Sequence, residues 1–395
     1  MEKWKEYKLG EVATPVRDRI ETSCLNSASY ISTENMLPDK AGVTLSSGVP
    51  SGSAISFRNE DILISNIRPY FKKIWRADRE GGCSADVICL RASNDIEPLF
   101  LYYLLSQDLF FDYVMQGAKG TKMPRGDRNQ IMQWPILLPS KSEQRNISSM
   151  LSALDNRIKV NRRINDNLEQ QAQALYKSWF VDFEPFRDGD FEESEKGIIP
   201  KGWKVGSLED ITVQKSERVG DRNDVKVLSP VTTGQLMLSE EYFTKQVFSE
   251  SIAKYKVVKV GDFAYNPARV NIGSLGRNNY DFDGCVSPVY VVFSCKDGYA
   301  YMFDLYRKTE KFKTEVNLRA IGGVRQSLNY KDFVFIQCII PPLNVVKDFN
   351  ALYEHLTVMQ KHTCEEIERL VSLRDTLLPR LMSGELKVNE LENKN

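Results

Sequence analysis

Residues 60–68, Glu-Asp-Ile-Leu-Ile-Ser-Asn-Ile-Arg, return in altered form as residues 261–269, Gly-Asp-Phe-Ala-Tyr-Asn-Pro-Ala-Arg. In both copies an aspartate precedes a short apolar run, and an arginine closes the stretch. Apolar runs of this length between polar residues are typical of buried strands. A sequence repeat at a separation of about 200 residues indicates a duplicated module rather than a short solenoid unit.

Other short segments match at nearly the same separation. The further pairs are Lys3-Trp4-Lys5 with Gly202-Trp203-Lys204, Gly82-Cys83 with Gly284-Cys285, and Ile136–Pro139 with Cys338–Pro341. Each half therefore follows one plan, in which a mixed globular region with short β-type runs and amphipathic helices is followed by one long helical segment. A length of 395 residues suits two such modules.

The first long helix is predicted to begin at Ser140, because Glu143 completes a capping box with it. No Gly or Pro interrupts residues 140–184, and Pro185 ends the segment. About 40 residues at 1.5 Å each give a helix of about 60 Å, too long to be buried in one domain. Its apolar seam is Ile147, Leu151, Leu154, Ile158, Leu168, Leu175 and Trp179.

The second long helix, at about residues 344–383, repeats this seam at Phe349, Tyr353, Leu356, Ile367, Leu370, Leu377 and Leu381. Arg374 interrupts the seam, and Pro379 should kink or end the last turn. Two copies at one place in a duplicated chain favour an antiparallel helix pair over ordinary core helices. Asn161 and Asn165 either fix the register of that pair or are exposed.

Bulk properties narrow the classes of function. The 53 basic and 53 acidic residues cancel, which argues against a non-specific DNA coat but not against a reader with local basic loops. The seven cysteines include no C-x-x-C pair, so neither a zinc site nor a disulfide framework is predicted. No secretory signal or membrane span is recognisable in the sequence.

Several motifs, in order, resemble the specificity subunits of Type I restriction–modification systems. Residues 174–186 resemble the central conserved segment of that family, and Ile199–Trp203 resembles its entry into the second target-recognition domain. Pro139–Gln144 resembles the family's entry into the first spacer helix, and Leu377–Leu386 its usual ending. With the duplication, the resemblance spans the whole chain. It departs where Val345-Val346 replaces Glu143-Gln144 in the second helix.

The resemblance implies a non-catalytic DNA-binding subunit of a cytoplasmic bacterial or archaeal complex, with no membrane partner. Two adenine-N6 methyltransferase subunits would bind it and carry S-adenosylmethionine, and translocase–nuclease subunits would carry ATP and Mg. This chain itself would bind no cofactor and no metal. Each target-recognition domain would read one half of a bipartite double-stranded DNA site, and the helices would set the spacing.

The predicted class is α+β, with two similar mixed α/β domains, two long antiparallel helices forming a coiled coil, and a pseudo-twofold internal repeat. The predicted boundaries are 1–140 for the first target-recognition domain, 141–184 for the first spacer helix, 185–200 for a linker, 201–342 for the second domain, 343–384 for the second helix and 385–395 for the tail.

Basic side chains on Gly-containing or aromatic-containing segments are the candidates for DNA contact, because such loops can approach phosphate and arginine can pair with guanine. In the first half they are Arg68, Tyr70, Lys72, Lys73, Arg76, Lys119, Lys122, Arg125 and Arg128; in the second they are Arg269, Asn271, Arg277, Arg325 and Gln326. The alternative is a solvated surface loop. We interpret Tyr70, Phe71 and Trp75 more readily as core than as base-stacking groups.

No catalytic residues are predicted. The chain lacks the Asn/Asp-Pro-Pro-aromatic motif of an amino-methyltransferase, a Walker loop and a nuclease-type acidic cluster, and it has only two histidines. Two alternatives remain open: a fused restriction or modification enzyme with unrecognised motifs, and a coiled-coil scaffold without a role on DNA.

Overall fold

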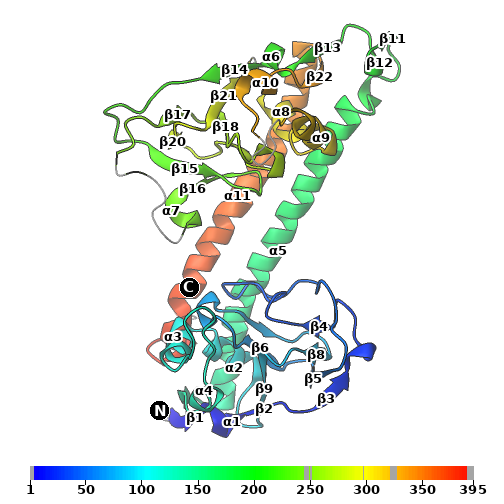
Figure 1. The fold of residues 1–395 in the computed structure, drawn as a ribbon. Helices are drawn as coiled ribbons and strands as arrows, with labels where there is room; N and C mark the ends of the chain where they lie inside the picture. The colour runs from blue at the N-terminus through cyan, green and yellow to red at the C-terminus, as the bar shows by residue number, and fades with distance from the viewer. Residues whose placement is uncertain (1–3, 244–248, 250, 297, 321–326, 389–395) are drawn as a thin grey trace. The chain divides into compact units, whose positions relative to one another are not determined.

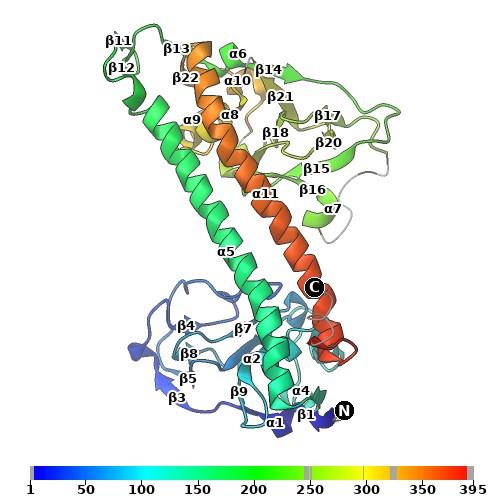
Figure 2. The same ribbon diagram turned by 180° about the vertical axis from the view of Figure 1, so that it is seen from behind.

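The computed structural model describes residues 4–243, 249, 251–296, 298–320 and 327–388. The chain divides into two compact units, Met1–Arg162 with Cys364–Asn395, and Arg163–Thr363. Two long helices, α5 (Lys141–Phe180) and α11 (Leu343–Met382), contribute residues to both units, and Figure 2 shows each as an unbroken helix. The predicted class, mixed α/β with two domains and two long helices, is confirmed.

The first unit contains two four-stranded sheets (Figure 1). One sheet has the order β2 (Ala13–Pro15), β9 (Val87–Ala92), β6 (Ile62–Ser65), β7 (Ile74–Arg76), and the other the order β3 (Arg19–Glu21), β5 (Ser53–Phe57), β8 (Gly81–Cys83), β4 (Tyr30–Ile31). A two-stranded ribbon joins β1 (Lys5–Lys8) to β10 (Pro135–Leu138). The short helices are α1 (Leu9–Val12), α2 (Pro98–Leu105), α3 (Asp108–Gln116), α4 (Arg128–Ile131) and the 3-10 turns η1 (Thr22–Cys24) and η2 (Pro69–Phe71).

The second unit repeats this arrangement. Its sheets have the orders β14 (Thr212–Lys215), β21 (Val291–Cys295), β18 (Phe263–Tyr265), β19 (Leu275–Arg277), and β16 (Leu236–Leu238), β15 (Lys226–Pro230), β20 (Gly284–Val286), β17 (Lys256–Val258). Two ribbons pair β13 (Lys204–Ser207) with β22 (Gln337–Ile340) and β11 (Phe191–Ser194) with β12 (Gly197–Pro200). The helices are α6 (Leu208–Ile211), α7 (Ser239–Tyr242), α8 (Ala300–Tyr306), α9 (Glu310–Arg319), α10 (Tyr330–Phe333) and the turns η3 (Glu184–Phe186) and η4 (Val270–Ile272).

The duplication extends to strand register. Ile62 lies opposite Arg76 in the first unit, and Phe263 lies opposite Arg277 at the corresponding place in the second. In each unit one parallel strand pair stands among antiparallel ones, β4 with β8 and β15 with β20. The units differ at a sheet edge, where β3 pairs with β5 but only an isolated bridge from Arg218 to Lys256 forms at the equivalent place.

The core of the first unit is closed by both long helices. Ile147 and Leu151 of α5 and Leu378 and Leu381 of α11 are buried in one cluster with the side chains of α2 and α3. The described residues 364–388 thus belong to the same compact unit as the amino-terminal residues. A Cβ atom built on Gly384 would lie 3.2 Å from the indole of Trp4, so this contact suits glycine.

Aromatic side chains fill the core of the second unit. The rings of Phe263 and Phe293 stack with centroids 5.3 Å apart, and Phe303 meets Phe263 edge-on at 5.0 Å. The two long helices join this core, because the ring of Phe180 on α5 meets that of Phe349 on α11 at 4.7 Å. Such ring pairs add about 0.5–1.5 kcal/mol each beyond their burial.

Some predicted helices have different bounds. Residues 98–116 form two helices, α2 and α3, because the hydroxyl of Ser106 ends α2 by donating to the carbonyl of Tyr102 at 2.7 Å. The helix α5 ends at Phe180, since Phe183 adopts a left-handed conformation with φ of 53°. The helix α11 continues through Pro379 for one more turn. Within the described ranges, no helix is long and apolar enough to cross a membrane.

Candidate nucleic-acid interface

The two basic segments predicted in the first half lie side by side in the first unit. The backbone N–H of Arg68 donates to the carbonyl of Pro124 at 2.8 Å, and Ile67 forms a β-bridge with Arg125. Lys119 and Arg125 also pair across a tight loop through two reciprocal backbone hydrogen bonds of 2.9 Å. Segments separated by about 50 residues in sequence therefore present one continuous basic surface.

The turn η2 at the centre of this surface has an unusual backbone. Arg68 and Lys72, which flank it, have φ of 50° and 51°, in the left-handed region that favours glycine. A second loop supports the turn, because the N–H groups of Asp39 and Lys40 donate to the carbonyls of Phe71 and Lys72 at 2.9 and 3.1 Å. The sequence analysis did not select Lys40, although Pro38 followed by Asp39 is a turn signal that could have located this loop.

Most cations of this surface are paired with carboxylates. The pairs join Lys72 to Asp108 at 2.9 Å, Arg76 to Glu60 at 2.6 Å, Lys119 to Asp127 at 3.5 Å and Arg125 to Asp86 at 3.2 Å. Exposed ion pairs of this kind are worth about 0–1 kcal/mol each. A phosphate group can therefore replace the carboxylate partner at little cost.

The other predicted cations differ in whether their side chains already donate hydrogen bonds within the protein. Lys73 donates its Nζ to the carbonyl of Thr33 at 2.6 Å, and burial together with the nearby cation of Arg68 lowers its pKa. Arg128 donates to the carbonyl of Ala85 at 2.5 Å. Lys122 is exposed at the tip of its loop. Lys73 is thus a structural donor, whereas Lys122 is available for contact.

The aromatic residues of this region divide into two groups. Trp75 is 8% exposed and belongs to the core, as expected from the sequence. Tyr70 and Phe71 are 47% and 38% exposed, so the interpretation of these two side chains as core residues was wrong. The physical reason is the turn η2, which points them away from the sheets that bury Trp75.

In the second unit, Arg269 is exposed at the start of η4, and Asn271 lies within that turn. Arg277 lies on β19, where its guanidinium stacks on the ring of Tyr301 at 4.6 Å and donates to the carbonyl of Gly261 at 3.3 Å. The structure therefore engages Arg277 in packing. Arg325 and Gln326 lie outside the described residues.

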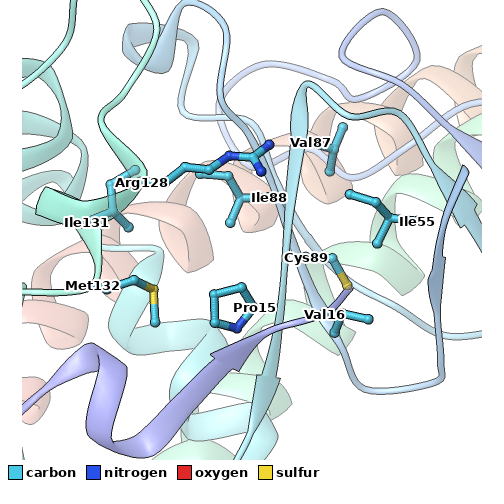
Figure 3. Close-up of a pocket in the computed structure, with 9 residues that line it drawn as sticks. All are labelled: Pro15, Val16, Ile55, Val87, Ile88, Cys89, Arg128, Ile131 and Met132. Atoms are coloured by element: carbon cyan, nitrogen blue, oxygen red, sulfur yellow. The ribbon is translucent and has the colours of Figure 1, made fainter. Parts of the chain in front are cut away.

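Figure 3 shows a small, mostly apolar pocket in the first unit. It has a volume of about 40 Å³ and is lined by Pro15, Val16, Ile55, Val87, Ile88, Cys89, Arg128, Ile131 and Met132. A volume of this size holds about one water molecule or methyl group, far less than a cofactor pocket requires. Among the side chains that the structure describes, no group of three His, Cys, Asp or Glu residues could hold a metal ion.

None of the side chains predicted for the helix pair is exposed. Those on α5 that are buried are Ile147, Leu151, Ile158 and Leu168, with Leu154, Leu175 and Trp179 partly buried; on α11, Phe349, Tyr353, Leu370 and Leu381 are buried and Leu356, Ile367 and Leu377 partly buried. Asn161 is also buried, at 2% exposure. The pattern missed Tyr176 and Phe180, which form a second buried stripe in the core of the second unit.

Comparison with known proteins shows what this chain is similar to. A family model described as the Type I restriction modification DNA specificity domain matches residues 1–170. The HindI specificity subunit of Haemophilus influenzae is 22% identical across 98% of this chain and 100% of its own length. The MjaVIII specificity subunit of Methanocaldococcus jannaschii is 25% identical across 99% of this chain and 94% of its own. The chain is thus similar to Type I restriction–modification specificity subunits.

The fold of this chain also has a counterpart in a solved structure. The Type I restriction–modification S subunit from M. genitalium superposes with a TM-score of 0.59 at 14% identity, and the alignment covers 96% of each chain. The matched family model and relatives are described as specificity domains or specificity subunits, not as methyltransferases or nucleases.

Proposed function

We propose that this chain is a Type I specificity subunit that reads a bipartite and asymmetric double-stranded DNA site, with one half-site bound by each unit. The observation that supports this proposal is the repeated turn at the end of an equivalent strand, η2 after β6 and η4 after β18. The two turns carry different side chains, Pro-Tyr-Phe and Val-Asn-Ile, and each is followed by a residue with left-handed backbone, Lys72 and Gly273. Because base edges are read by side chains, unlike loops should select unlike half-sites.

The first unit's basic surface supplies the phosphate and base contacts in this proposal. Lys119, Lys122 and Arg125 would contact the DNA backbone, and Arg68 lies next to them on the braced turn. In the second unit, Arg269 and Asn271 would act at the equivalent turn. The sequence-based assignment of Arg325 and Gln326 to the same surface remains part of the proposal.

We also propose that the two long helices set the number of unspecified bases between the half-sites and provide the docking surface for two adenine-N6 methyltransferase subunits. A groove of about 500 Å³ beside α5 is lined by Glu97, Leu99, Arg145, Ser148, Ser149, Ser152, Ala153 and Asn156. Small side chains along a helix allow another helix to approach closely. S-adenosylmethionine would bind in the methyltransferase partners, and ATP with Mg in the restriction partners, within a cytoplasmic complex.

Methylome sequencing of a host that expresses this chain with its methyltransferase partner tests the proposal. We expect modified adenines in a two-part motif whose halves differ and are separated by unspecified bases. A palindromic or continuous motif would contradict the asymmetric, bipartite reading. Methylation by the purified chain alone would instead favour a fused enzyme, and a complex without sequence preference would favour a scaffold.

A further inference from the structure

An exposed apolar tip projects from the basic surface of the first unit. Tyr70 and Phe71 are 47% and 38% exposed, and their ring centroids lie 4.7 Å apart. Lys72 and Lys73 follow them directly, and Arg68 precedes the turn by one residue. Exposure of large apolar side chains to water is unfavourable. Their position on an exposed turn among cations therefore points to a ligand with both apolar and anionic parts.

The turn that carries this tip is rigid. Four of the six non-glycine residues with left-handed backbone in the described part of the chain are here, namely Asp39, Lys40, Arg68 and Lys72. The backbone bonds from Asp39 and Lys40 hold the turn from one side, and Asp108 binds Lys40 and Lys72 at 3.0 and 2.9 Å. Strained conformations of this kind cost about 1–3 kcal/mol each, and they persist where the surroundings over-determine them.

The second unit repeats the device with different chemistry. In η4 the residue equivalent to Phe71 is Ile272, which is 57% exposed, and Gly273 takes the place of Lys72 with φ of 96°. A loop again supports the turn from the side, because a Cβ atom on Gly273 would lie 2.6 Å from the carbonyl oxygen of Thr232. The same place in the fold thus carries an exposed apolar residue in both copies.

We propose that these tips are wedges that insert between neighbouring base pairs, Tyr70 and Phe71 in the half-site of the first unit and Ile272 in that of the second. Phe, Leu, Ile, Met and Pro side chains inserted at a base step unstack it and kink the duplex, while nearby cations hold the phosphates. A rigid tip suits this role, since it loses little conformational freedom on insertion. The wedge rests on the proposed DNA-reading function and adds a contact that reads the deformability of one step.

The test uses the full chain assembled with its methyltransferase partner and duplexes that carry the methylated motif. The variant Tyr70→Ser with Phe71→Ser removes the first wedge, and Leu137→Ser is the matched control because Leu137 is 37% exposed on β10. Phe71→Leu keeps an apolar tip. We expect the double variant to bind the specific duplex about 10- to 100-fold more weakly, and Leu137→Ser and Phe71→Leu to bind almost as the natural chain does.

A scan of single mismatches along the half-site gives a sharper readout. A mismatch at the wedged step removes part of the unstacking cost, so the natural chain should bind that one duplex at least ~10-fold more tightly than duplexes mismatched at its neighbours. The wedge-free variant should bind all of these mismatched duplexes with similar affinity. Identical mismatch profiles for both proteins would overturn the wedge.

Two further outcomes separate the wedge from its premises. If the double variant keeps its DNA affinity but no longer assembles with the methyltransferase, the apolar tip is a protein-docking surface and the wedge is wrong. If the natural complex does not distinguish its motif from a scrambled duplex, the proposed function itself fails. Thermal unfolding of each variant confirms that the exposed substitutions leave the fold intact.

Discussion

In the first unit, Arg374 of α11 donates to the carboxylate of Asp155 on α5 at 3.0 Å. The same carboxylate accepts the hydroxyl of Tyr103 on α2 at 2.7 Å, and Arg157 forms a second bond between the helices with Glu366 at 3.0 Å. Arg374 interrupts the apolar seam in the sequence, but the structure gives it a partner. The order of these two pairs also shows that residues 141–162 and 364–382 run antiparallel within this unit.

Replacing Arg374 with Met should destabilise the first unit by about 1–3 kcal/mol, because the partly buried Asp155 would lose its cation. Denaturant unfolding measures the loss. The exposed Arg369 on the same helix provides the control, and Arg369→Met should change stability by less than about 0.5 kcal/mol. Adding Asp155→Asn to Arg374→Met should recover part of the loss; equal losses for both arginine variants would show that the pair contributes nothing.

The ion pairs of Asp108 should produce an acid-dependent part of stability. Although partial burial alone would raise it, hydrogen bonds from Lys72 and Lys40 lower the pKa of Asp108 below its usual 3.8. A carboxyl group whose pKa is depressed in the folded state stabilises the fold at pH values above its unfolded-state pKa. This stabilisation is lost as the pH falls through the folded-state pKa. Asp108→Asn should therefore cost under about 1 kcal/mol at pH 6–7, since the side chain is 59% exposed, and nothing at strongly acid pH. A difference independent of pH would contradict this cause.

Lys122 should act as a phosphate contact. Its replacement with Ala should weaken binding to specific and scrambled duplexes by the same factor, and the slope of log affinity against log salt should fall by about 1. Fluorescence anisotropy at four or five salt concentrations gives both quantities. Lys159→Ala on the exposed face of α5 is the control and should leave the slope unchanged. An unaltered slope for Lys122→Ala would remove this residue from the interface.

Gly81 on β8 should tolerate no side chain. A Cβ atom there would lie 2.2 Å from the carbonyl oxygen of Ser29 and 2.7 Å from the ring of Phe57. Gly81→Ala should therefore destabilise the first unit by about 1–3 kcal/mol. Gly48→Ala is the matched control, because nothing lies within 4 Å of its Cβ position. If both variants unfold at the same denaturant concentration, the close approach at β8 is not a constraint.

The groove beside α5 should accept the methyltransferase. Ala153→Arg places a long side chain in the groove, so co-purification with the partner should be lost while thermal unfolding stays unchanged. Asn146→Arg alters an exposed position of the same helix outside the lining and should assemble normally. Normal assembly of Ala153→Arg would place the docking surface elsewhere.

The repeat and both long helices could be predicted because their signals are local and periodic. The cap at Ser140 is one example, since its hydroxyl accepts the N–H of Glu143 at 3.3 Å. The second buried stripe of α5, at Tyr176 and Phe180, escaped prediction because a heptad seam describes contact with another helix only. These rings pack on a domain core, which periodicity alone does not reveal.

The candidate DNA surface was predictable in composition but not in geometry. Clusters of basic residues named Lys72 and Arg125, but no local pattern indicates that Lys72 pairs with Asp108 or that Arg125 lies beside Ile67. Trp75 is buried whereas Tyr70 and Phe71 are exposed, and this difference depends on the backbone conformation of the turn η2. Contacts between residues far apart in sequence determine the ion pairs and the exposure of these side chains, and sequence periodicity does not reveal such contacts.

The most direct test of the claim that each unit reads one half-site is a segment exchange. Residues 1–140 are replaced with the equivalent segment of a relative whose complex methylates a different motif. Methylome sequencing of the exchanged protein should show one altered half of the motif, while the other half and the number of unspecified bases between them stay unchanged. A motif altered in both halves, or in neither, would contradict the assignment of one half-site to each unit.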